Sequence, residues 1–172
     1  MTHRLLLLVS SLGLLASATA LSAAADTTVA SFTLTAGALS ISAPAGPVSL
    51  GSQVASTSAT TITGTLGVVT VSDQRGGVTT WTASVIATSF TPVPTGPANP
   101  ASNASYAAGT ITASPTVTAT AVAASNLIGV STVVTGAGTG ISSASWNPSI
   151  SVIVPANYAP GVYSSTITHS VA

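Results

Sequence analysis

The sequence contains no cysteine, no lysine and no glutamate, and charged side chains make up only 2% of it. A typical soluble domain has about a quarter charged residues. The lack of cysteine excludes disulfides, thiolate nucleophiles and cysteine-ligated zinc. The lack of lysine excludes Schiff-base chemistry. Two basic residues cannot form the positive surface that nucleic acids require, so nucleic-acid binding is also excluded.

The remaining ionisable residues are too few for most catalytic sites. After position 25, only His169 with Asp26 or Asp73 offers a base and an orienting acid for a serine nucleophile. The Gly-x-Ser-x-Gly turn of such hydrolases does not occur. Two aspartates and one histidine also fall short of the ligand sets of calcium and zinc. The sequence therefore predicts a noncatalytic protein that needs no metal or other cofactor.

The first 25 residues have the pattern of a secretory signal peptide. A short basic start over residues 1–4 precedes an apolar run over residues 5–15, and small residues follow up to Ala25. The apolar run is shorter than the roughly 20 residues that span a bilayer. We expect cleavage after Ala25, with Ala20 as the alternative, and an exported domain over residues 26–172. Neither end predicts a lipid or transmembrane anchor, so any hold on the cell surface would be noncovalent.

After position 25, apolar residues alternate with Thr or Ser, and Gly and Pro interrupt the pattern at short intervals. About a third of all residues are Ser or Thr, which suit a half-exposed sheet. No segment repeats apolar residues at helical spacing. We predict an all-β fold, a single antiparallel β-sandwich or a partly closed barrel of about nine or ten strands. The expected strands cover residues 29–35, 39–41, 60–63, 66–72, 79–87, 110–113, 116–123, 127–134, 149–154 and 161–171.

All seven aromatic side chains lie after position 25, and we expect most of them to fill the core. In the strand expected over residues 79–87, Trp81 shares a face with Ala83 and Val85, whose small size leaves room for an indole ring. In the last expected strand, His169 shares a face with Tyr163. A single histidine in that position is more often a hydrogen-bonded structural residue than a ligand.

Asp73 and Arg75 are opposite charges two positions apart, just before a pair of glycines. The sequence allows two interpretations of this pair. It can fix a turn next to a core tryptophan, or it can form a binding surface with an exposed Trp81. In the second case, the ring would stack on a sugar or peptide while the charged groups form bidentate hydrogen bonds.

Residues 71–76 (Val-Ser-Asp-Gln-Arg-Gly), with Trp81 to Val85 and Phe90-Thr91 after them, resemble the central motif of WxL-domain surface proteins of Gram-positive bacteria. Residues 32–41 and 161–168 are similar to the same family, particularly to its secreted actinobacterial members. Ala83 stands where the family has its leucine. In the distal tryptophan motif, Pro148 follows Trp146-Asn147 in place of the expected leucine.

The resemblance implies a β-rich domain that attaches noncovalently to the cell wall through peptidoglycan. The candidate wall- or ligand-binding residues are Asp73, Arg75, Trp81 and Trp146. The alternative is a structural subunit that associates with itself through sheet edges into a surface fibre or layer. A net charge of zero removes the repulsion that normally keeps domains apart, so this alternative stays open.

Overall fold

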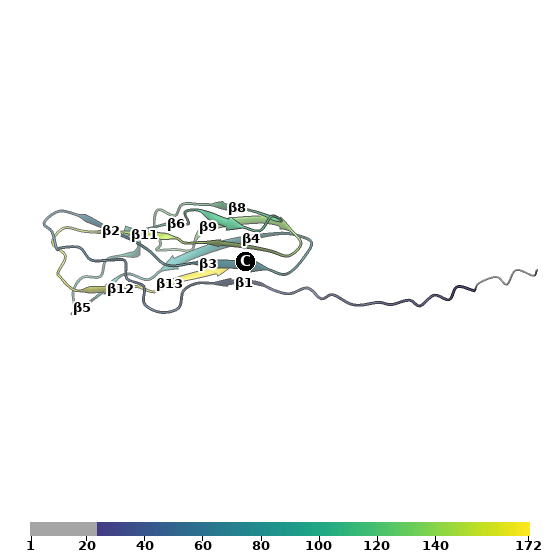
Figure 1. The fold of residues 1–172 in the computed structure, drawn as a ribbon. Helices are drawn as coiled ribbons and strands as arrows, with labels where there is room; N and C mark the ends of the chain where they lie inside the picture. The colour runs from purple at the N-terminus through teal and green to yellow at the C-terminus, as the bar shows by residue number, and fades with distance from the viewer. Residues whose placement is uncertain (1–23) are drawn as a thin grey trace, which may run out of the picture. The chain divides into compact units, whose positions relative to one another are not determined.

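The computed structural model describes residues 24–172 (Figure 1). Residues 35–172 form one compact unit, whereas residues 24–34 are extended, exposed and without strand pairing. The expected signal peptide lies outside the described residues except for Ala24 and Ala25. In the described part of the chain, no helix is long and apolar enough to cross a membrane.

The compact unit is all-β, as the sequence predicts, and its only helical element is the single 3₁₀ turn η1 (Ala101–Asn103). Every strand pairing is antiparallel. Residues 35–172 contain thirteen strands: β1 (Leu39–Ser42), β2 (Thr60–Thr65), β3 (Val69–Asp73), β4 (Val78–Ala87), β5 (Thr91–Val93), β6 (Ala104–Ala107), β7 (Ile111–Ala113), β8 (Val117–Ala121), β9 (Ser131–Thr139), β10 (Ser142–Trp146), β11 (Ser149–Val154), β12 (Val162–Ser164) and β13 (Ile167–Val171).

One layer of the unit consists of two sheets that lie end to end along the strand direction. The first has the order β1-β3-β10-β7 and the second the order β2-β11-β6. Three chain segments pass from one sheet to the other, because β2 precedes β3, β10 precedes β11 and β6 precedes β7. Between the sheets, the N–H of Leu66 donates to the carbonyl of Pro148 at 3.0 Å. These connections explain the length of the unit in Figure 1.

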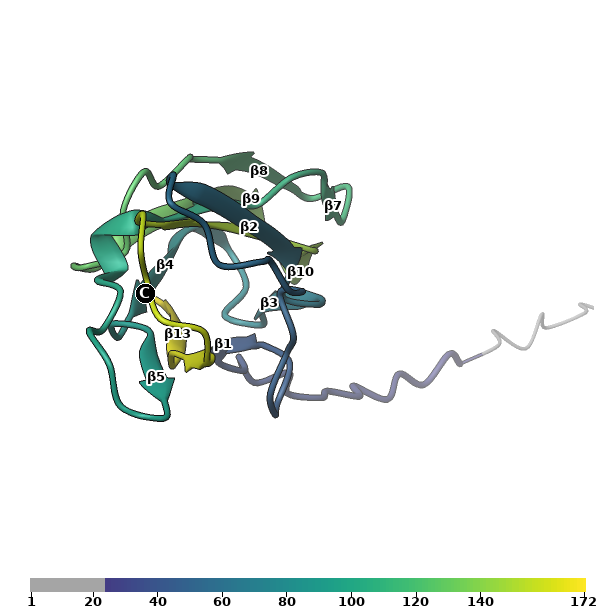
Figure 2. The ribbon, with the colours of Figure 1, turned by 90° about the vertical axis from the view of Figure 1, so that its left-hand side faces the viewer.

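The other layer contains the sheet β13-β4-β9-β8, and β5 pairs with β12 beyond it. At the two sides of the layers, β1 lies against β13 and β7 lies against β8. No sheet closes into a barrel. Figure 2 looks along the unit and shows its strands around a common interior. The arrangement is therefore sandwich-like.

The period-two alternation of the sequence directs one face of each strand inward. Every second residue is buried in β3, in β10 and in β4 from Trp81 onward. Trp81 pairs across strands with Gly136, and a Cβ atom on that glycine would overlap the indole ring. The largest fully buried apolar side chains are Tyr106, Leu127, Ile150, Val69, Val71, Val85, Val133 and Val134.

The structure differs from the expected strands in several places. Residues 29–35 form no strand, although they alternate correctly, because the alternation supplies a face but not a partner edge. The strand expected over residues 127–134 is instead β9, which begins at Ser131. The count exceeds nine or ten because β5, β6 and β10 lie outside the expected strands, and because the strand expected over residues 161–171 is divided into β12 and β13.

Candidate functional site

Asp73 ends β3 at an inward-facing position, and its side chain is fully buried. Its carboxylate accepts four hydrogen bonds. Arg75 supplies three of them, from its backbone N–H at 3.1 Å and from Nε and Nη2 at 2.9 Å each. The Thr79 hydroxyl supplies the fourth at 2.8 Å. A buried carboxylate is stable only with such partners, and the ion pair agrees with the turn-fixing interpretation of these two charges.

Arg75 holds the turn by which the chain crosses from β3 to β4. Its Nη2 also donates to the carbonyl of Thr80 at 2.9 Å. Gly76 and Gly77 both adopt positive φ, which suits glycine, and the carbonyl of Gly77 accepts a hydrogen bond from the N–H of Gly140. The pair therefore fastens a turn that joins the two layers. We call Asp73 and Arg75 the turn clamp.

The electrostatics of the turn clamp keep Asp73 ionised. Its hydrogen bonds with the Arg75 side chain hold the pKa of the carboxyl well below its usual range, despite the opposing effect of burial. The Thr79 hydroxyl lowers the pKa further. A carboxylate with so low a pKa is a poor general base, so the clamp does not provide acid–base chemistry.

The two tryptophans lie in the core. Trp81 is 3% exposed and Trp146 is 2% exposed. The core interpretation of Trp81 therefore holds, and its indole is not available to stack on a ligand. Of the four predicted site residues, the structure brings only Asp73 and Arg75 into contact. Trp81 directly follows Thr80 of the clamped turn, but its ring turns inward.

Trp146 belongs to a buried hydrogen-bonded chain that sequence reasoning missed. Its Nε1 donates to the Tyr106 hydroxyl at 2.8 Å, and that hydroxyl lies 3.3 Å from Nε2 of His169. The three residues come from three different sheets, so no local pattern signals their contact. An indole N–H can only donate, so the Tyr106 hydroxyl accepts from Trp146, and the tautomer of His169 sets the direction of the second hydrogen bond. His169 is therefore hydrogen-bonded, as expected of a structural histidine in that position.

Burial shifts the pKa values of the two ionisable side chains in this hydrogen-bonded group, Tyr106 and His169. Burial raises the pKa of Tyr106 to about 12, although the hydrogen bond with Trp146 opposes this shift. Burial likewise lowers the pKa of His169. Nδ1 of His169 is buried and has no hydrogen-bond partner in the described part of the structure. Because Asp73 is bound within the turn clamp, it does not orient His169 as a catalytic acid would.

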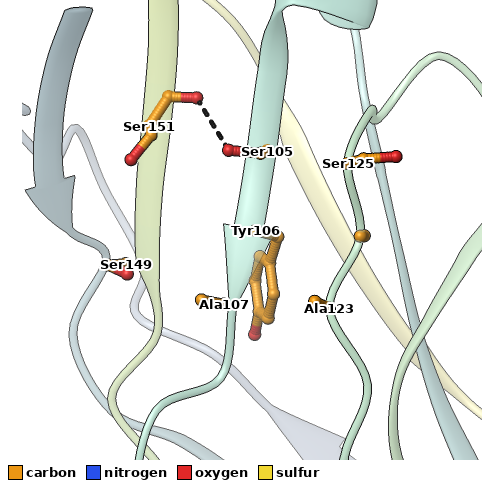
Figure 3. Close-up of a pocket in the computed structure, with 8 residues that line it drawn as sticks. Ser105, Tyr106, Ala107, Ala123, Ser125, Ser149 and Ser151 are labelled. Atoms are coloured by element: carbon orange, nitrogen blue, oxygen red, sulfur yellow. Dashed lines mark hydrogen bonds between the residues drawn. The ribbon is translucent and has the colours of Figure 1, made fainter.

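A small pocket of about 230 Å³ lies beside β6 (Figure 3). Its labelled side chains are mostly Ser and Ala, and the Ser105 hydroxyl donates to the carbonyl of Ser151 at 3.4 Å. The pocket therefore offers neutral hydroxyl groups and small apolar contacts. In residues 24–172, no group of three or more His, Cys, Asp or Glu could hold a metal ion.

A larger groove of about 760 Å³, which we call the lateral groove, runs between β2 and β11 on one side and β12 and β13 on the other. Residues 43–56 form its outer wall. Side chains that line its interior include Ile62, Leu66, Phe90, Val152, Tyr163 and His169. It is apolar at its base and has no ionised residue among its lining side chains. No local sequence pattern predicts this groove, because its residues come from distant segments.

No family model matches the chain, and no curated protein or solved structure matches it either.

Proposed function

We propose that this protein is an exported, noncatalytic surface module that associates noncovalently with the cell wall through peptidoglycan. The observation that carries the proposal is the turn clamp. In the clamp, the carboxylate of Asp73 is buried and holds the turn, while the Arg75 side chain stays 37% exposed. Arg75 uses Nε and Nη2 in its hydrogen bonds within the described residues, which leaves Nη1 free to donate.

The exposed edge of Arg75 is suited to an anionic or carbonyl-rich ligand. A guanidinium binds carboxylates well, and the stem peptides of peptidoglycan carry carboxylates. The clamp fixes the side chain before binding, so little conformational entropy is lost when a ligand binds. Trp81 packs in the core next to the clamped turn, whereas Trp146 is buried beside Val69 at the opposite end of β3, so neither ring would touch the wall.

Sedimentation of the purified exported protein with isolated cell-wall sacculi tests this proposal. We expect the wild type to sediment and the double variant Asp73→Asn/Arg75→Gln, which replaces the clamp without leaving an unpaired buried charge, to remain in solution. Near-UV circular dichroism must show that this variant is folded. A wild type that stays in solution would overturn wall association, and a folded double variant that still sediments would remove Arg75 from the site.

A second function is self-association into a surface fibre or layer. It is favoured by the exposed residues 24–34, in which Phe32 is 91% and Leu34 is 90% exposed. Apolar side chains with this exposure on a strand-patterned segment are typical of a surface that pairs with another chain. Filaments that form with rising protein concentration, in the absence of sacculi, would support this function.

A further inference from the structure

We propose that residues 27–35 of one copy enter the lateral groove of a second copy as an added β-strand beside β2, joining copies head to tail. This inference rests on the second function above, self-association. It specifies both the surface that is bound and the segment that binds it.

The lateral groove lies where one layer lacks a strand. At the other end of this layer, β1 pairs with β3 and lies against β13, which covers that side of the core. After Ser42 the chain leaves the sheet, so β2 pairs only with β11. Every second residue of β2 therefore directs its N–H and C=O toward an edge with no strand beside it in the described structure.

Residues 43–56 cover this edge without replacing a strand. Leu50 packs on the inward side of Gly64, where a Cβ atom would lie 2.6 Å from the Cα of Leu50. In the described residues, the backbone hydrogen bonds of this segment go to its own Ser49 hydroxyl and to the N–H of Asn157, not to β2. Because the segment forms no backbone hydrogen bonds with β2, the main chain of β2 stays open to an entering strand, whose apolar side chains would replace the packing of Leu50.

Residues 27–35 have the pattern that such a strand requires. In extended conformation, Ala30, Phe32 and Leu34 share one face, and Ser31 and Thr33 share the other. The apolar face matches the apolar interior of the lateral groove, and the polar face would continue the solvent-exposed face of β2. Addition of a strand to a sheet edge gains main-chain hydrogen bonds as well as apolar burial.

The length of the segment favours a second copy over the chain's own groove. The segment leaves the compact unit beside Gln74, whose carbonyl accepts a hydrogen bond from the N–H of Gly37. At about 3.3 Å per residue, residues 60–73 extend over at most about 43 Å, with Thr60 at the far end of β2. Nine extended residues span about 30 Å, and the chain before β1 leaves past Asp73, away from β2, so the segment is too short to turn back and fill its own groove.

Copies placed end to end in the same orientation resolve this mismatch. The segment of one copy then enters the next groove at the Thr60 end and runs antiparallel to β2, as β1 runs antiparallel to β3. The donating and accepting surfaces differ, so the contact repeats without closing and builds a filament. Only Asp26, Asp73 and Arg75 are charged in residues 24–172, so repulsion between copies is weak.

Engineered cysteines test the contact directly, because the chain has none of its own. The exported full-length protein is made as separate single variants, Thr33→Cys as donor and Thr61→Cys or Thr63→Cys as acceptor. After donor and acceptor are mixed and mildly oxidised, we expect disulfide-linked heterodimers. The matched control acceptor is Thr118→Cys, an exposed threonine on the edge strand β8. Equal crosslinking to Thr118→Cys, or none to either β2 variant, would overturn the proposal.

A pair of charge variants separates this proposal from self-association in general. Phe32→Asp places a charge on the apolar face of the segment, outside the compact unit, and should leave the protein monomeric in sedimentation velocity. Val29→Asp makes the same charge change on the opposite face and should still assemble. If Phe32→Asp still assembles, the strand-addition contact is wrong, although self-association through another surface would stand. A wild type that stays monomeric at every concentration would sink self-association itself.

Discussion

At the scale of single residues, the turn clamp shows how composition and burial combine. The sequence places opposite charges two positions apart, and the structure pairs them at 2.9 Å. An exposed pair contributes only about 0 to 1 kcal/mol. Here Asp73 is fully buried and Arg75 is not, so removal of the arginine alone would leave an uncompensated buried charge. The pair is therefore a constraint on the turn more than a source of stability.

Asp73 should make the protein sensitive to acid. Its pKa in the folded state lies below that of the unfolded chain, so its stabilising effect is complete above about pH 4 and is lost as the pH falls further. The slope for one proton approaches about 1.4 kcal/mol per pH unit. Denaturant unfolding between pH 5 and pH 2 should show this loss in the wild type and in the exposed control Asp26→Asn. The same slope in Asp73→Asn would refute the assignment.

His169 should add a second pH dependence at higher pH. Burial lowers its pKa in the folded state, so the unfolded chain takes up the proton first. Stability is then complete above about pH 6.5 and decreases as the pH falls through that value. His169→Gln should remove the decrease between pH 7 and pH 5, while Asp73→Asn should keep it. A wild type with constant unfolding free energy over that range would contradict this expectation.

The Tyr106 hydroxyl joins side chains from three sheets, so its loss affects more than one partner. Tyr106→Phe keeps the ring but leaves Trp146 Nε1 buried without an acceptor. We expect a loss of about 1 to 3 kcal/mol in the free energy of unfolding. Tyr163→Phe, whose hydroxyl bonds only to the nearby Ala159 carbonyl in an exposed position, is the matched control. Equal losses in both variants would show that the buried chain contributes nothing specific.

At the scale of elements, the size of a buried side chain is limited by its cross-strand partner. Trp81 of β4 fits only because its cross-strand partner in β9 is Gly136. The indole ring therefore accounts for a glycine inside a strand, where glycine normally weakens pairing. Strand pairing also explains why residues 29–35 form no strand. They have the alternation of a strand, but no strand edge of their own chain lies beside them.

The Trp81–Gly136 pair gives a double-mutant test. Trp81→Ala should lower the free energy of unfolding by about 3 to 5 kcal/mol, and Gly136→Ala by about 1 to 3 kcal/mol through overpacking. The double variant should cost less than the sum, because the smaller side chain relieves the overlap. Gly129→Ala, which meets no atom within 4 Å, is the control. Additive losses would contradict the contact.

At the scale of the whole molecule, the near-absence of charge has a direct experimental consequence. Arg75 is the only Lys or Arg in residues 24–172, so trypsin has one cleavage site there. The turn clamp should protect it in the native protein. We expect slow native digestion and, after denaturation, rapid cleavage into two large fragments. Fast native cleavage at Arg75 would show that the turn is open, and faster cleavage in Asp73→Asn would identify the clamp as the cause.

The sequence by itself determined the all-β class and the inward face of most strands, and it placed Asp73 and Arg75 close enough to pair. These depend on local quantities, namely period-two alternation, strand propensity and a separation of two residues. The tertiary structure alone decided that both tryptophans are buried, that Tyr106 meets Trp146 and His169, and that a groove remains beside β2. Those outcomes depend on which strands become neighbours, and residues far apart in the chain carry no local signal of that choice.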